Sequence, residues 1–100
     1  RAIHSFDQDG WIVAARVCNQ ATAATGIDAG NTCVVALAVT AGAVASKTYN
    51  NTTVFPAANT QDSLGAITNP HAPKGDVLTL AVTQGATANA GPFLVQVDYV

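Results

Sequence analysis

The sequence predicts an all-β protein, a single-domain antiparallel β-sandwich of jelly-roll-like type spanning residues 1–100. A chain of 100 residues is long enough for one hydrophobic core but not for two. No stretch carries the apolar stripe at i, i+3, i+4 and i+7 that an amphipathic helix requires. Several segments instead alternate with a period of two, as half-buried strands do, and turn residues separate them.

The expected strands cover residues 11–18, 32–40, 43–49, 52–55, 63–68, 76–84 and 93–100. A turn containing Asp and Gly precedes the first of them, and Arg16 marks its exposed face. Residues 32–40 are apolar on both faces, which indicates a central strand, and Gly42 breaks the chain after it. Residues 63–68 form only a weak strand pattern. Two prolines then hold residues 69–75 as a loop.

The last two strands have the clearest pattern. The first places Leu78, Leu80 and Val82 on one face, and the second does the same with Phe93, Val95, Val97 and Tyr99. Because only a glycine-bounded loop separates them, we expect the two strands to pair as an antiparallel hairpin. The total of seven or eight short strands is typical of a two-sheet sandwich or a jelly roll.

The only two cysteines, Cys18 and Cys33, lie at the end of one long strand and near the start of the next. If these strands pair as a hairpin, the two side chains lie close together, and we expect a disulfide. It would close a loop of 14 intervening residues, contribute about 3 kcal/mol in the chain-entropy model, and imply an oxidising or extracellular setting. The alternative is two reduced cysteines that pack as small hydrophobic side chains.

The remaining reactive side chains do not form a recognisable site. Neither His4 nor His71 stands at a zinc-ligand spacing from the cysteines, so no metal or cofactor is expected. His4, Ser5 and Asp7 lack the Gly-x-Ser-x-Gly elbow of a nucleophilic serine. The sequence therefore predicts that the protein is not an enzyme.

Charged residues make up only 10% of the chain, with a net charge of −2. The four basic residues are scattered, whereas a nucleic-acid site needs clustered Lys and Arg. No apolar run approaches the roughly 20 residues of a membrane span. A surface with so few charges has little protection against self-association, which suggests that other subunits cover part of it; the alternative is a monomer surfaced with Ala and Thr. We therefore expect a homo-oligomer with no nucleic-acid or membrane partner.

Two aromatic residues are candidates for binding. Trp11 directly follows a turn, and Tyr49 ends an expected strand. Amphipathic aromatic side chains are favoured at interfaces, so each is a candidate for contacting a partner protein or a sugar, although the core of the sandwich is the alternative location for both. The chain starts at Arg1, before which an initiator methionine is not normally removed, so we expect a fragment or processed product of a longer chain.

Three segments resemble small β-sandwich modules in virion proteins of tailed bacteriophages. These are Gly10-Trp-Ile-Val-Ala-Ala-Arg16, the strand from Asp28 to Val39, and the closing run Pro73-Lys-Gly-Asp-Val-Leu-Thr-Leu-Ala-Val-Thr-Gln-Gly85 followed by Gly91-Pro-Phe-Leu-Val-Gln-Val-Asp-Tyr. The likeness covers most of the chain and consists of general strand patterns. The cysteine pair departs from many such modules.

The resemblance implies a structural virion protein located in the extracellular particle. The leading hypothesis is a capsid decoration or cement subunit, a trimer, that stabilises the phage head by binding the major capsid protein. The alternative is a receptor-binding or carbohydrate-binding domain of a tail or head fibre, in which Trp11 or Tyr49 stacks on sugar rings. A third hypothesis is an adhesin module of cellular origin.

Overall fold

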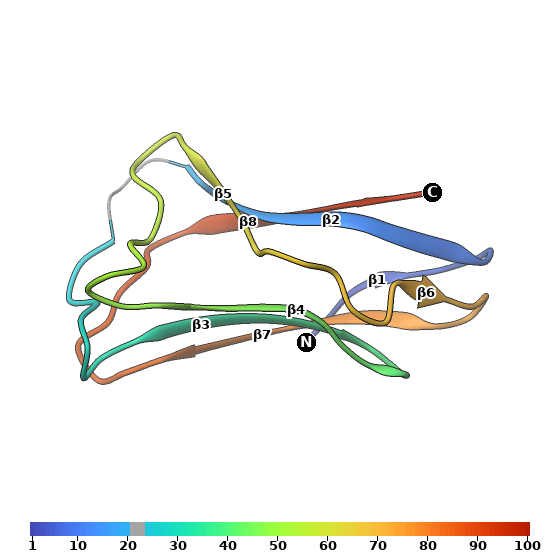
Figure 1. Ribbon diagram of the computed structural model, residues 1–100, viewed down its shortest axis with the longest axis horizontal. Helices are drawn as coiled ribbons and strands as arrows, with labels where there is room; N and C mark the ends of the chain where they lie inside the picture. The colour runs from blue at the N-terminus through green and yellow to red at the C-terminus, as the bar shows by residue number, and fades with distance from the viewer. Residues whose placement is uncertain (21–23) are drawn as a thin grey trace.

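A computed structural model describes residues 1–20 and 24–100 as two antiparallel sheets packed face to face (Figure 1), which confirms the predicted all-β sandwich. The strands are β1 (Ala2–Ser5), β2 (Gly10–Asn19), β3 (Cys33–Val39), β4 (Gly42–Tyr49), β5 (Gln61–Ser63), β6 (His71–Ala72), β7 (Val77–Gln84) and β8 (Phe93–Tyr99). No membrane-spanning helix occurs in the described ranges.

The first sheet has the strand order β1-β7-β3-β4. Its central strand is β3, as its two apolar faces predicted, and it pairs antiparallel with β4 on one side and β7 on the other. Thr40 and Ala41 form the turn between β3 and β4. Gly42 follows with φ of 140°, a region that L side chains rarely adopt. The break expected at Gly42 is thus a tight hairpin turn.

The second sheet is built around β2. Strand β8 pairs with one edge of β2, and the short strands β5 and β6 pair with the other. The β2–β8 pairing continues one step beyond β8, because Trp11 and Val100 exchange two backbone hydrogen bonds of 2.7 and 2.9 Å. Strands β2 and β8 consequently run side by side along the upper layer of Figure 1.

The predicted hairpin of the last two strands is wrong. Strand β7 belongs to the first sheet and β8 to the second, so the connection between them crosses the sandwich. Strands β2 and β3 are separated in the same way. Most of the residues assigned to the inner faces of β7 and β8 do contact the core: Leu78 is buried, and Leu80, Phe93, Val95 and Val97 pack against it. Val82 and Tyr99, at the ends of these series, are 38% and 47% exposed. Alternation reports which side is buried and not which strand lies alongside.

Three further segments differ from the sequence prediction. Residues 52–55 form no strand, because the Asn50 side-chain oxygen accepts hydrogen bonds from the backbone N–H groups of Thr52 and Thr53 and closes a turn. The weak strand expected at 63–68 lies earlier, at β5, and ends at Ser63. Strands β1 and β6 were not predicted; both are short and lie at sheet edges.

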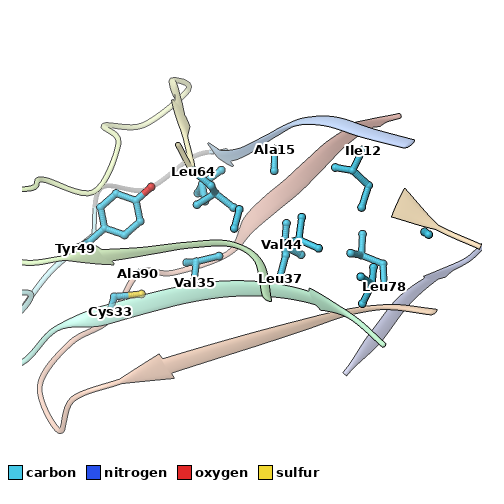
Figure 2. Close-up of a cluster of buried hydrophobic side chains, with 14 of the residues drawn as sticks. Ile12, Ala15, Cys33, Val35, Leu37, Val44, Tyr49, Leu64, Leu78 and Ala90 are labelled. Atoms are coloured by element: carbon cyan, nitrogen blue, oxygen red, sulfur yellow. The ribbon is translucent and has the colours of Figure 1, made fainter. Parts of the chain in front are cut away.

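The core fills the space between the two inner faces (Figure 2). Strand β3 contributes every second residue, so that Val35 and Leu37 are fully buried, and β2 faces them with Ile12, Ala15 and Val17. Aromatic rings continue the core toward the loops at one end: the centroids of Tyr49 and Phe55 lie 4.9 Å apart, and those of Phe55 and Phe93 lie 5.5 Å apart. These rings link β4 to β8 across the sandwich.

Candidate interaction surface

The predicted disulfide is absent, since Cys18 and Cys33 are both free thiols. Cys33 lies on the inner face of β3 and is fully buried, whereas Cys18 lies on the outer face of β2, in the other sheet. Cys18 alternates with the inward-facing Val17 and pairs across the strand with the exposed Leu94. The two side chains therefore project into different environments, and the alternative of packing as small hydrophobic side chains holds for Cys33.

The two thiols are expected to react with an alkylating reagent at different rates. Burial raises the pKa of the Cys33 thiol and blocks access to it, while Cys18 is partly exposed. Mass spectrometry of the native protein without reductant should therefore show rapid modification of Cys18 alone. Both cysteines should react in denaturant without reductant. A denatured protein in which neither reacts would contradict the free-thiol arrangement.

Tyr49 is fully buried, so the proposal that it contacts a partner or a sugar is wrong. Its hydroxyl donates a hydrogen bond of 2.7 Å to the Asp62 carboxylate, which also accepts from Lys47 Nζ at 2.6 Å. Lys47 and Tyr49 come from β4, and Asp62 comes from β5 in the opposite sheet. The cluster therefore joins the two sheets along one side of the sandwich.

The ionisation of this cluster suits a structural role. Burial and the hydrogen bond to Asp62 raise the pKa of Tyr49. The Tyr49 hydroxyl therefore stays protonated and can act as a hydrogen-bond donor to Asp62. Burial also acts to raise the pKa of Asp62, but the hydrogen bonds from Lys47 and Tyr49 outweigh it and leave the pKa below the ordinary 3.8. Asp62 is thus a charged acceptor at neutral pH, and it accepts from two donors at once.

A buried carboxylate, Asp76, secures the opposite end of the sandwich. Asp76 Oδ1 accepts hydrogen bonds from the Thr40 hydroxyl at 2.5 Å and from the Val77 N–H at 2.7 Å. The hydrogen bond from Thr40 is the largest cause that keeps the pKa of Asp76 below 3.8, and the bond from Val77 adds to it. Because Thr40 lies in the β3–β4 turn, Asp76 fixes that turn to the start of β7.

Acid is expected to remove this support. A carboxyl group with a lowered pKa in the folded state stabilises the protein above its unfolded-state pKa and loses that effect as the pH falls through its folded-state value. Wild type should therefore melt at a higher temperature than Asp76→Asn at pH 7. The difference should shrink below pH 3.8. Thermal melts from neutral to acid pH measure this, and a difference independent of pH would contradict the role of the charge.

Trp11 is half exposed, so it does not lie in the core of the sandwich, and its contact with a partner stays a prediction. It lies on the outer face of β2 next to His71 of β6, with ring centroids 5.6 Å apart and an interplanar angle of 33°. The short pairing of Gly10 and Trp11 with β6 brings the two rings together. Trp11 thus presents a fixed aromatic surface to solvent.

Trp11 belongs to a wider apolar surface that we call the β2–β8 outer face. Its apolar members are each at least half exposed: Trp11 51%, Val13 53%, Leu94 54% and Val100 80%. Between them lies an ion pair, with Arg16 Nη2 2.6 Å from Asp98 Oδ2. A partly exposed pair of this kind contributes only about 0–1 kcal/mol to stability. The face consequently combines exposed apolar side chains with internally neutralised charge.

A shallow cavity of about 160 Å³ opens beside this face, between the edges β1 and β8. Ile3, His4, Leu78, Val97 and Tyr99 line it. The His4 and Tyr99 rings lie 5.1 Å apart, and both rings contact Phe6. The sandwich is therefore closed by polar bonds at the β4–β5 side and left apolar and open at the β1–β8 side.

Other sequence-predicted residues are not brought into a site. Within residues 1–20 and 24–100, no three side chains of the His, Cys, Asp and Glu types gather in a way that could hold a metal ion. Sequence reasoning did not identify Val13, Leu94 and Val100, although alternation with the buried positions of β2 and β8 could have signalled their exposure. The contact between Tyr49 and Asp62 had no sequence signal, because it depends on β4 and β5 lying at the same side of the sandwich, one in each sheet.

No protein-family model, curated protein or solved structure matches this chain.

Proposed function

We propose that the protein is a structural subunit of a bacteriophage virion, a decoration or cement subunit that stabilises the head by binding the major capsid protein. The β2–β8 outer face carries this proposal. Covering exposed apolar surface yields about 25 cal/mol per Å², and interfaces have a more apolar core inside a polar rim. The resemblance of residues 10–16 and 73–99 to virion modules supplies the class of partner.

Binding to expanded capsids built from the major capsid protein tests this function. In co-sedimentation, Trp11→Ser and Leu94→Ser should each weaken binding at least about tenfold, as central apolar contacts do. Val54→Ser is a matched control, because Val54 is a strongly exposed apolar residue in a loop outside this face. Absence of capsid binding by the wild type, or equal loss in Val54→Ser, would contradict the proposal.

One observation favours the alternative of a carbohydrate-binding fibre domain: the half-exposed Trp11 ring beside His71 could stack on a sugar. The two functions differ in what they require of the face. Sugar stacking needs Trp11 alone, whereas capsid docking uses Leu94 as well. Saturable binding on a glycan array that is abolished in Trp11→Ser and unchanged in Leu94→Ser would support the fibre domain over the cement subunit.

A further inference from the structure

Every sheet edge except β8 carries a feature that hinders pairing with another chain. Strand β1 has four residues and a register irregularity between Ala2 and His4. Strands β5 and β6 have only three and two residues. Short strands and bulges are the usual means of protecting an edge.

The long edge strand β4 is protected by its neighbours. Its Lys47 points inward to Asp62, and the register shifts where Val44 is inserted. The loop between β5 and β6 also covers part of this edge, because Thr68 N–H donates to the Val44 carbonyl and Asn69 Nδ2 donates to the Ala43 carbonyl. Strand β4 is thus bent, charged and covered.

Strand β8 is neither short nor bulged, and its one charged residue, Asp98, is paired with Arg16. Its seven residues, Phe-Leu-Val-Gln-Val-Asp-Tyr, include no Lys, Arg, Pro or Gly. The irregularity in its pairing, between Ile12 and Ala14, inserts the extra residue in β2 and leaves β8 regular. Throughout the described ranges, β8 pairs with β2 alone. Alternate N–H and C=O groups along its outer edge are therefore available to another strand.

We propose that this edge binds the β8 strand of a second copy of the chain, antiparallel, about a two-fold axis at Gln96. In this register all seven residues overlap. Val95 faces Val97 of the second copy, and Phe93 faces Tyr99. Asp98 lies opposite Leu94 and not opposite another carboxylate, and it is already neutralised by Arg16 at 2.6 Å. Cross-strand pairs of this kind favour association, whereas like charges placed directly opposite oppose it.

The surface around β8 is large and apolar enough for this contact. The protein measures 40 × 24 × 21 Å, so a side that runs along its long axis is comparable with the roughly 800 Å² per partner of a standard interface. The open cavity of about 160 Å³ between β1 and β8, with the partly exposed Ile3 and Tyr99, lies on this same side. A second copy paired at β8 would cover this cavity and the exposed parts of Ile3 and Tyr99.

The pairing is independent of the virion function, since it requires no capsid, and a two-fold contact differs from the trimer implied by the resemblance. Sedimentation equilibrium from low micromolar to millimolar concentration tests it. Wild type should reach twice the chain mass of 10.1 kDa. Gln96→Lys, which sets two like charges opposite each other at the axis, should raise the dissociation constant at least about tenfold.

Gln61→Lys is the matched control, because it makes the same change at an exposed position of β5, on the opposite edge of the same sheet. It should dimerise as wild type does, and circular dichroism should show all three proteins folded. Hydrogen exchange should also slow in about half of the β8 amides as wild type concentration rises. A monomer, a trimer, equal weakening by Gln61→Lys, or exchange in β8 that does not depend on concentration would overturn the pairing.

Discussion

Replacing Tyr49 with alanine should lower the free energy of unfolding by about 3–5 kcal/mol, the range for removing a buried aromatic side chain. Tyr49 is the largest fully buried side chain. Its ring packs against Phe55 at 4.9 Å, and its hydroxyl donates to Asp62 at 2.7 Å. The substitution opens a cavity between the sheets and also removes one of the two side chains that donate to the Asp62 carboxylate.

Tyr49→Phe separates these two effects. It keeps the ring and removes only the hydroxyl. A hydrogen bond to a charged group contributes about 1.5–3 kcal/mol, and Asp62 is screened because about a third of its side chain is exposed. We therefore expect a loss near the lower end of that range. Urea unfolding followed by circular dichroism measures both variants. If Tyr49→Phe cost as much as Tyr49→Ala, the ring would contribute nothing and the packing argument would fail.

The periodicity of the sequence predicted the strands and their buried faces but not their neighbours. In β3 the alternating apolar positions are all buried, and in β7 and β8 most of them contact the core, with Val82 and Tyr99 as the exposed exceptions. Alternation has the same form whether the partner strand lies alongside in one sheet or opposite in the other. Strands adjacent in sequence were assumed to pair, and for β2–β3 and β7–β8 the connections instead cross between sheets.

The error in topology produced the error at the cysteines. Cys18 alternates with Val17 and shares the outer face of β2 with Arg16, whereas Cys33 begins the inward-facing series of β3. The position of Arg16 on the exposed face already indicated that Cys18 faces outward, so the sequence contained a signal against the disulfide. The assumption of a hairpin outweighed it.

The polar contacts could not be predicted without the topology. Arg16 and Asp98 are 82 residues apart in sequence, and Lys47 and Asp62 are 15 apart. The first pair forms only because β2 lies beside β8, and the second only because β4 and β5 lie at the same side of the sandwich. The position of His71 beside Trp11 likewise depends on the short pairing of β2 with β6, and β6 lies in the loop at residues 69–75 that was expected to be irregular.

Gly26→Ala should destabilise the protein by about 2–4 kcal/mol, because two costs act at one position. Gly26 has φ of 70°, and a Cβ there would lie 1.9 Å from the carbonyl oxygen of Thr87. The contact involves backbone on both sides, since Thr25 and Asn89 exchange two hydrogen bonds of 2.8 Å next to it. Neither segment can move away without breaking that pair.

Gly91→Ala distinguishes the clash from the backbone conformation. Gly91 has nearly the same φ, 68°, but no atom lies within 4 Å of a Cβ built there. It should therefore show only the left-handed backbone cost of about 1–2 kcal/mol, and the excess in Gly26→Ala measures the clash with Thr87. Urea unfolding of the two variants gives that difference directly. Equal losses would mean that the connections from β2 to β3 and from β7 to β8 do not lie close together at Gly26. The crossed topology would then lose the close approach of Gly26 to Thr87 that supports it.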